Sequence, residues 1–297
     1  MPVQAADAPA KARVNAQVNA MTVDVEDYFQ VQAFAACIDR SSWDAIPRRV
    51  EANMERILEQ FDRAGVQATF FTLGWIAERH PALVRQIVAA GHELASHGYG
   101  HQLVHDLSPD QFRADIVRAK AVLEDLGAVA VTGYRAPTFS IGPRNPWAFD
   151  VIEDTGHRYS SSIYPVRHDL YGVPDAPRFP HRAGSGALVE IPMTTLQLGR
   201  RNMPIAGGGY FRLMPYVVYR AALRRFNGSE RAAGVFYFHP WEIDAGQPRI
   251  RAASRLSRFR HYVNIASVPR RLERLLRDFR WGRMDQVFAA DLARLGA

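Results

Sequence analysis

Cysteine and lysine are nearly missing from this 297-residue chain, and each scarcity excludes a class of structure. Cys37 is the single cysteine, so an intramolecular disulfide and a multi-cysteine zinc site are excluded. Lys11 and Lys120 are the only lysines among 37 basic residues, so arginine carries nearly all of the positive charge. A metal ion in this protein would therefore have to bind histidine, aspartate or glutamate.

Long apolar runs are also missing. No stretch of about 18 apolar residues occurs, and the first twenty residues lack the apolar run of a secretory signal. We therefore expect no transmembrane segment and a cytoplasmic location, with the inner membrane surface as the alternative. The composition, 47% hydrophobic and 23% charged, is that of a globular protein and excludes a disordered, collagen-like or coiled-coil chain.

The positive charge is a weak indication of function. The 30 acidic residues leave a net charge of +7, and many arginines lie within residues 249–283. Some of these arginines share the helix predicted at 268–279 with a stripe of leucines, and the arginines form no recognised nucleic-acid motif. We expect a solvated helical face there, packing of the leucines in the core, and no nucleic acid as a partner.

Predicted strands and helices alternate along the chain, which favours an α/β fold with a largely parallel sheet, closed or open. Buried or β-branched runs predict the strands, and apolar residues at helical spacing, followed by glycine, predict several helices. The strands are expected at 20–25, 68–73, 92–96, 129–132, 158–162 and 235–238, and the helices at 48–64, 81–90, 108–127, 147–154, 215–226 and 268–279. The irregular stretch 164–209 is expected to form an active-site rim.

Residues that could bind a metal ion follow two of these strands. His97 and His101 are four residues apart and can point at one ion, for which a nearby carboxylate would be the third ligand. Asp24, Glu26 and Asp27 supply carboxylates after the first strand. If strand geometry continues past Asp24, Glu26 points the same way; if the strand ends there, Asp27 can turn inward.

A histidine and an arginine follow two further strands. His239 stands between aromatic residues after the strand at 235–238 and suits a general acid. Arg135 can pair with a carboxylate and hold it ionised. All of these residues fall at the carboxyl ends of predicted strands, where parallel α/β folds place their active sites. The sequence thus favours a metal-assisted hydrolytic site.

The order and spacing of these motifs resemble the polysaccharide deacetylases of carbohydrate esterase family four, the NodB-homology group. The matching motifs are residues 22–27, 96–101, 135–137 and 238–240, with a degenerate fourth motif at 159–164. Residues 24–29, 161–165, 207–211, 239–242 and 260–262 resemble, more narrowly, the subgroup encoded at exosortase (PEP-CTERM) exopolysaccharide loci. The resemblance implies a distorted, incomplete (β/α) barrel. It also implies one catalytic domain at 20–297 that includes a C-terminal subgroup extension, and the residues before it, 1–19, are expected to form a flexible tail.

The resemblance implies an enzyme that removes N-acetyl groups from an amino-sugar polysaccharide, an exopolysaccharide or its lipid-linked precursor. The implied cofactor is a divalent ion, zinc first and cobalt or nickel otherwise, bound by His97, His101 and one of Glu26 and Asp27. Proteins of exopolysaccharide assembly are the implied partners.

The resemblance also implies the roles of the other residues. Asp24, held by Arg135, would be the base, His239 would protonate the leaving amine, and a backbone N–H near Thr138 would stabilise the oxyanion. The implied substrate-binding residues are Pro137, Thr138, Tyr164 and Trp241.

Two positions depart from the family pattern. Val25 stands where the metal-binding aspartate usually follows the base; strand alternation then favours Glu26 as the ligand, and side-chain length and type favour Asp27. Ser160 stands where the fourth motif has an aspartate that steadies the arginine. Activity would then be weak, unless other residues steady the arginine. Two alternatives remain open, a metal-free allantoinase-like cyclic amide hydrolase and a catalytically weak glycan-binding protein.

Overall fold

The computed structural model describes residues 17–296, and one curled sheet runs through them. The strands of this sheet are β1 (Val18–Val25), β2 (Thr69–Thr72), β3 (Glu93–Ser96), β4 (Gly133–Tyr134), β5 (Tyr159–Ser160), β6 (His181–Arg182), β7 (Val189–Glu190), β10 (Val235–Phe238) and β11 (Arg280–Gly282). Their order is β10-β1-β2-β3-β4-β5-β7-β6, and β11 pairs with β1. Every pair is parallel except β6 with β7.

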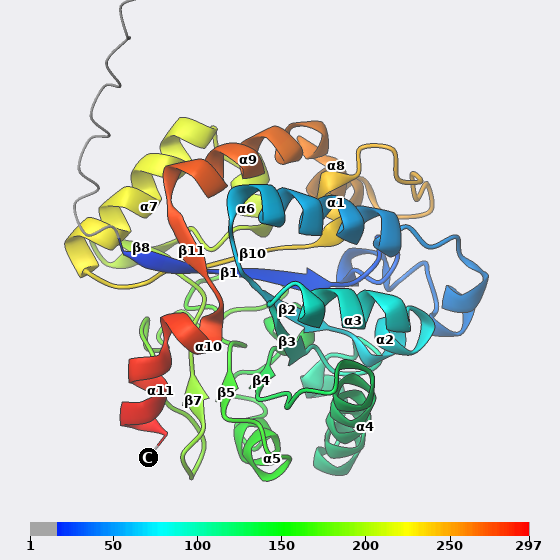
Figure 1. Ribbon diagram of the computed structural model, residues 1–297, viewed down its shortest axis with the longest axis horizontal. Coiled ribbons are helices and arrows are strands. Elements are labelled where there is room, and N and C mark those ends of the chain that lie inside the picture. Colours follow the sequence, from blue (N-terminus) through cyan, green and yellow to red (C-terminus); the bar gives the residue numbers. More distant parts are fainter. Residues whose placement is uncertain (1–16, 297) are drawn as a thin grey trace, which may run out of the picture.

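The sheet does not close into a full barrel. Strands β10 and β6 end the series and do not pair with each other in the described part of the chain. Figure 1 shows β1 in the middle of the molecule, with α1, α7 and α9 along one side and α4 and α5 on the other. The helices are α1 (Val50–Ala64), α2 (Gly74–Arg79), α3 (Pro81–Ala89), α4 (Pro109–Gly127), α5 (Ala148–Asp154), α6 (Gly208–Leu213), α7 (Tyr216–Glu230), α8 (Arg255–Tyr262), α9 (Val268–Asp278), α10 (Met284–Val287) and α11 (Ala289–Leu295). The expected distorted, incomplete barrel is confirmed.

Local signals in the sequence explain where two of the long helices start and stop. Helix α1 buries a stripe that includes Met54 and Phe61, and it ends at Gly65, whose φ of +63° suits a left-handed cap. Helix α4 starts at Ser108, whose side chain accepts a hydrogen bond from the Gln111 N–H in a capping box. Both helices match the prediction to within two residues.

The strand predicted at 129–132 is wrong, because these residues form no strand and β4 begins at Gly133. The backbone of Val131 is hydrogen-bonded to side chains of α4 and not to a neighbouring strand. Glu124 accepts a hydrogen bond from the Val131 N–H at 2.9 Å, and Lys120 donates to the Val131 carbonyl. With both groups occupied, Val131 cannot join the hydrogen-bond ladder of the sheet.

Two other boundaries differ from the prediction. Val18 and Asn19, predicted to belong to the tail, already lie in β1, and Asn19 accepts a hydrogen bond from the Gly234 N–H. The rest of the predicted tail, residues 1–16, lies outside the described residues, as does residue 297. The stretch 164–209 is more regular than expected, since it contains β6, β7 and a hairpin of β8 (Thr195–Leu198) and β9 (Arg201–Pro204).

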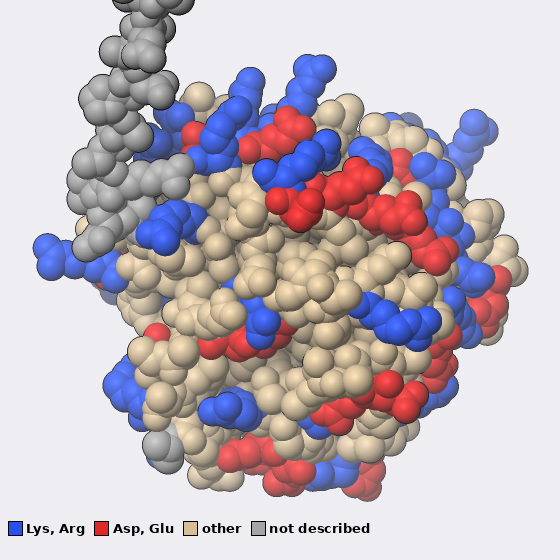
Figure 2. Space-filling model, in the orientation of Figure 1, with Lys and Arg blue, Asp and Glu red and all other residues tan. Residues whose placement is uncertain are grey.

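The leucines and arginines of α9 separate as predicted. Leu272, Leu275 and Leu276 are buried in the main hydrophobic cluster, and Arg270 and Arg274 are exposed. Figure 2 shows basic and acidic side chains interspersed over this part of the surface. Within residues 17–296, no helix combines the length and the hydropathy that a membrane crossing requires.

We predict that Gly207→Ala lowers the free energy of unfolding by about 2 kcal/mol or more, because this glycine has a φ of +122° and a Cβ would lie 2.1 Å from the Tyr237 carbonyl oxygen. Gly228, within α7, is the control: a Cβ there meets nothing within 4 Å, so Gly228→Ala should raise stability by about 0.5–1 kcal/mol. Urea denaturation of the two variants measures both effects. Equal stability of Gly207→Ala and wild type would contradict the close approach.

Candidate active site

The two acids that follow β1 point in different directions. Glu26 faces the loop after β3, where its Oε2 lies 2.9 Å from His101 Nε2. Asp27 turns toward the start of α1, and its carboxylate accepts hydrogen bonds from the backbone N–H groups of Arg49, Val50 and Tyr28. The chain therefore uses Asp27 to satisfy the N-terminus of a helix, which leaves Glu26 beside the histidines.

Three buried side chains, Glu26, His97 and His101, gather at this point. One ligand atom from each lies within 4.8 Å of the others. His97 Nδ1 lies 2.8 Å from the Arg135 carbonyl oxygen, so this nitrogen donates its hydrogen and Nε2 is left to bind a metal ion. His101 has a positive φ of 50°, a strained conformation of the kind that clusters at functional sites.

The electrostatics of this cluster suit a divalent cation. Burial opposes the charge of Glu26, but His101, His239 and His97 outweigh it and lower the pKa of Glu26 to about 2. Burial lowers the pKa of His97 to about 4, so His97 is neutral, the form that binds metals. No lysine or arginine pairs with Glu26 in the described part of the chain. Two imidazoles and one carboxylate form the donor set of a catalytic zinc site, so the residues fit such an ion.

Asp24 is held by a buried arginine. Arg135 is fully buried, and its Nη1 donates to Asp24 Oδ1 at 2.7 Å and to Thr22 Oγ1 at 2.8 Å. The rest of its guanidinium donates to the Ser161 carbonyl and hydroxyl, both at 3.1 Å, and lies over the ring of Phe71. Serine and threonine oxygens thus hold Arg135 without a second carboxylate.

The degenerate fourth motif is explained by this arrangement. Ser160, which stands where an aspartate was expected, donates to the Ser162 hydroxyl at 2.8 Å and does not reach Arg135. Its neighbour Ser161 supplies both of the contacts to Arg135 described above. The arginine is therefore fully bonded although the aspartate is missing.

His239 is paired with a glutamate three residues further along the chain. His239 Nδ1 lies 2.7 Å from Glu242 Oε1, and Glu242 Oε2 lies 2.7 Å from Arg212 Nε. The other nitrogen, Nε2, faces Glu26 at 3.2 Å and Asp24 at 4.0 Å. Burial opposes the charge of His239, but Glu26, Glu242 and Asp24 outweigh it and raise its pKa to about 9. The pair holds a protonated imidazole facing the two acids.

Asp24, Glu26, the two metal-site histidines and His239 line one cavity of about 140 Å³. Its wall contains two of the four predicted substrate-binding residues, Thr138 and Trp241, and does not contain Pro137 or Tyr164. Pro137 is buried, and Tyr164 is fully buried and stacked on Tyr171 at 5.8 Å. The cavity is lined by Asp24, Glu26, Val31, Gln32, His97, His101, Thr138, Phe139, Tyr171, Tyr237, His239 and Trp241.

Sequence reasoning missed several residues of the site. Glu242 pairs with His239, Arg212 pairs with Glu242, and Tyr171 lines the cavity. The three-residue spacing from His239 to Glu242 could have indicated their pairing. Arg212 and Tyr171 come from segments distant in sequence, and no local pattern identifies them.

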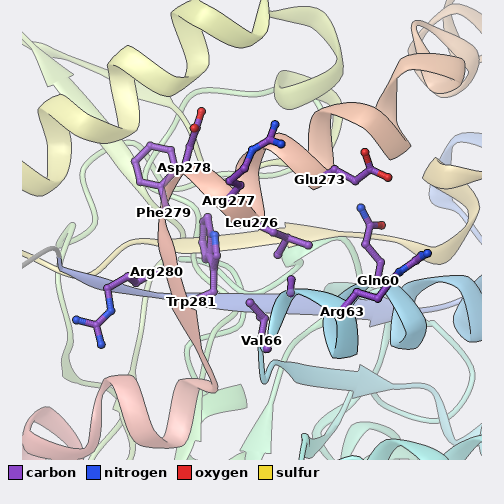
Figure 3. A pocket seen from close by; sticks show the side chains of 12 residues that line it. Gln60, Arg63, Val66, Glu273, Leu276, Arg277, Asp278, Phe279, Arg280 and Trp281 are labelled. Carbon is purple, nitrogen blue, oxygen red and sulfur yellow. The ribbon is translucent and has the colours of Figure 1, made fainter. Parts of the chain in front are cut away.

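A larger hollow of about 810 Å³ lies elsewhere, between the end of α1 and α9 (Figure 3). Its arginines, Arg63, Arg277 and Arg280, point in different directions, and it contains none of the predicted site residues. Trp281, in its wall, pairs with the first part of β1, whereas the predicted residues follow the carboxyl ends of the strands. We therefore place the active site in the smaller cavity.

Two family models match successive parts of the chain. Residues 40–160 match the model described as polysaccharide deacetylase, and residues 161–289 match a domain of unknown function, DUF3473. Asp24 and Glu26 precede both matches, so their place in the site rests on the geometry. His239 and Glu242 lie within the second match.

The chain is also similar to individual proteins. A peptidoglycan-N-acetylglucosamine deacetylase from Bacillus cereus is 33% identical over 28% of this chain and 30% of its own length. A chitooligosaccharide deacetylase from Sinorhizobium fredii is 30% identical over 48% of this chain and 60% of its own length, so the chain spans less than two thirds of either relative. A crystal structure from Mycobacterium smegmatis, provisionally named a polysaccharide deacetylase, superimposes with a TM-score of 0.61 at 20% identity, covering 99% of this chain and 95% of the other.

We predict that Glu26→Ala lowers zinc affinity at least about a hundredfold, because it removes one of three ligand atoms. Asp27→Ala should leave zinc affinity within a few fold of wild type. It should lower the free energy of unfolding by about 1–3 kcal/mol, because three backbone N–H groups lose their acceptor. Calorimetric zinc titration and urea denaturation of both variants check this. The reverse pattern would show that Asp27 binds the ion.

Proposed function

We propose, from the match of residues 40–160 to the polysaccharide deacetylase model, that the chain is a metal-dependent hydrolase that removes N-acetyl groups from an amino-sugar polysaccharide. One observation carries the proposal: a three-ligand cluster, an arginine-held carboxylate and a glutamate-held histidine face one cavity. These are the groups that hydrolysis of an amide requires.

The chain's own residues divide the proton transfers between them. Asp24 accepts the proton of the attacking water, and Arg135 holds this carboxylate in place at the cavity. His239 gives its Nε2 proton to the leaving amine, and Glu242 holds the opposite nitrogen so that the ring keeps this orientation. Glu26, His97 and His101 would hold the ion, which when bound lowers the pKa of water and polarises a carbonyl. The Thr138 N–H is our candidate for stabilising the oxyanion.

We propose zinc as the ion and one catalytic domain from β1 to the C-terminus. Contacts between the two matched segments support the single domain: β10 pairs with β1, β7 pairs with β5, and one hydrophobic cluster contains residues from Met21 to Trp281. The cytoplasmic location, the exopolysaccharide assembly partners and the exclusion of nucleic acid stay predictions.

The comparisons do not favour the two alternative functions. The relatives with named activities are deacetylases of peptidoglycan or chitooligosaccharide. A metal-free cyclic amide hydrolase would leave the His97–His101 pair without a use. Replacement of His97 by alanine separates an enzyme from a glycan-binding protein. If the protein is an enzyme, this variant loses acetate release and still binds the glycan.

We predict that the purified protein releases acetate from N-acetylglucosamine oligomers, and that a chelator abolishes this release until zinc is added back. Asp24→Asn should lower kcat at least about a hundredfold with zinc still bound, because an amide cannot accept the proton. Acetate assays paired with elemental analysis measure both quantities. Full activity after complete removal of the metal would exclude the proposal.

We further predict that Glu242→Gln lowers kcat about a hundredfold and changes KM less than threefold. The neutral amide no longer stabilises the protonated imidazole of His239 or holds the ring in place. Glu230→Gln is the matched control, since this glutamate pairs with Arg178 and lies outside the cavity wall. Steady-state kinetics on one oligomer compare the three proteins. Equal loss of activity in both variants would refute a specific role of Glu242.

A further inference from the structure

The segment 245–272 is rich in arginine and contains no aspartate or glutamate. Its arginines are Arg249, Arg251, Arg255, Arg258, Arg260, Arg270 and Arg271. Arg260 pairs with Asp169 at 2.8 Å. Arg249, Arg251 and Arg255 are exposed, and none of them forms an ion pair in the described part of the chain. This surface therefore carries positive charge that is free to attract an anionic partner.

Helix α8 exposes two large apolar side chains beside these arginines. Leu256 is 55% exposed and Phe259 is 58% exposed. Residues three apart in a helix are neighbours on its surface, so these two side chains lie side by side. Arg255 and Arg258 directly precede them in the chain. An apolar pair flanked by arginines is the pattern of a helix that lies in the surface of a membrane.

The opposite side of α8 is fixed to the rest of the protein. His261 is buried, and its ring lies 4.6 Å from that of Phe34 and 4.1 Å from that of Trp241, measured between centroids. At the start of the helix, the Ser254 side chain accepts a hydrogen bond from the Ser257 N–H at 3.0 Å. The helix is thus held rigidly while its outer apolar pair stays exposed.

These same contacts place α8 beside the candidate active site. Trp241 belongs to the wall of the cavity, and its ring stacks on His239 at 5.0 Å. Gln32, also in this wall, lies on the same short helical turn as Phe34, which packs on α8. Figure 1 shows α8 toward the side of the molecule to which the arrow of β1 points. A partner bound to α8 would therefore lie close to the cavity.

The apolar pair decides which anionic partner fits this surface. An acidic polysaccharide or a nucleic acid would attract the arginines through charge alone and would leave Leu256 and Phe259 in water. A membrane with anionic lipids offers negative charge at its surface and an apolar layer just below it. Only the membrane matches both features of α8.

We propose that α8 and the turn before it dock this protein on a membrane that contains anionic lipids. Leu256 and Phe259 enter the boundary between headgroups and acyl chains, and Arg251 and Arg255 lie among the headgroups. The inference goes beyond the proposed function, because docking needs neither a metal ion nor a sugar. Docking would bring the cavity to the surface at which the glycan of a lipid-linked substrate lies.

The first test measures co-sedimentation of the full chain with vesicles of phosphatidylcholine and phosphatidylglycerol in equal amounts. Leu256→Ser combined with Phe259→Ser should lower the affinity at least about tenfold, because the buried apolar area is lost. Val117→Ser combined with Leu198→Ser is the control, since these side chains are 48% and 45% exposed on other elements. Equal affinity of the α8 variant and the control variant would overturn the inference.

The second test removes charge. Arg251→Gln combined with Arg255→Gln should lower the affinity for the same vesicles about tenfold, and vesicles of phosphatidylcholine alone should bind at least about tenfold more weakly. Arg224→Gln combined with Arg225→Gln removes the same charge from exposed positions of α7 and should have little effect. Equal losses in the two variants would overturn docking through α8. Dependence on the arginines without dependence on the apolar pair would instead indicate an anionic polymer and would also overturn it.

The third test detects insertion directly and does not depend on activity. Cys37 is the single cysteine, so Cys37→Ser allows an environment-sensitive dye to be attached at one chosen position. A dye on Leu256→Cys should brighten and shift its emission to the blue on the mixed vesicles, because it enters an apolar layer. The same dye on Val117→Cys should keep its emission. An unchanged spectrum at position 256 would overturn the inference and leave the proposed function intact.

Discussion

The buried pair of Arg135 and Asp24 is the interaction on which the site depends. A charge this deeply buried costs several kcal/mol unless it is paired, and every nitrogen of this guanidinium has a partner. The same residue also fixes a proposed metal ligand, because its carbonyl oxygen accepts the hydrogen of His97 Nδ1. One arginine therefore sets the distance between the proposed base and the histidine pair, through its side chain on one side and its backbone on the other.

The second matched segment completes both the sheet and the candidate active site. Residues 161–289 supply β10, which lies beside β1, and with it His239 and Glu242. They also supply Arg212, which lies against the carboxylate of Glu242. The stretch matched as polysaccharide deacetylase contributes the histidine pair and Arg135. Asp24 and Glu26 precede both stretches, so the candidate active site combines three parts of the chain, and the segment of unknown function is one of them.

The sequence predicted the parallel fold and most strands and helices, because hydrophobic spacing, helix caps and glycine stops are local signals. It also predicted which strand ends bring the candidate residues together, since each motif directly follows its strand. The strand predicted at 129–132 does not form because α4 side chains bind Val131, a tertiary contact that no local pattern records. The choice between Glu26 and Asp27 needed the structure for the same reason, because it depends on where α1 begins relative to β1.

The gap between β10 and β6 has a consequence for how such proteins diversify. In a closed barrel the first and last strands must pair, whereas here the two edge strands need not meet. Loop closure costs little more as a connection lengthens, so residues could be inserted near the gap without disturbing the paired strands. The stretch 164–209, which includes edge strand β6 and Tyr171 of the cavity wall, is the place where this freedom is greatest. Changes there would alter the wall of the candidate cavity, while the candidate catalytic residues at the carboxyl ends of β1, β3 and β10 stay in place.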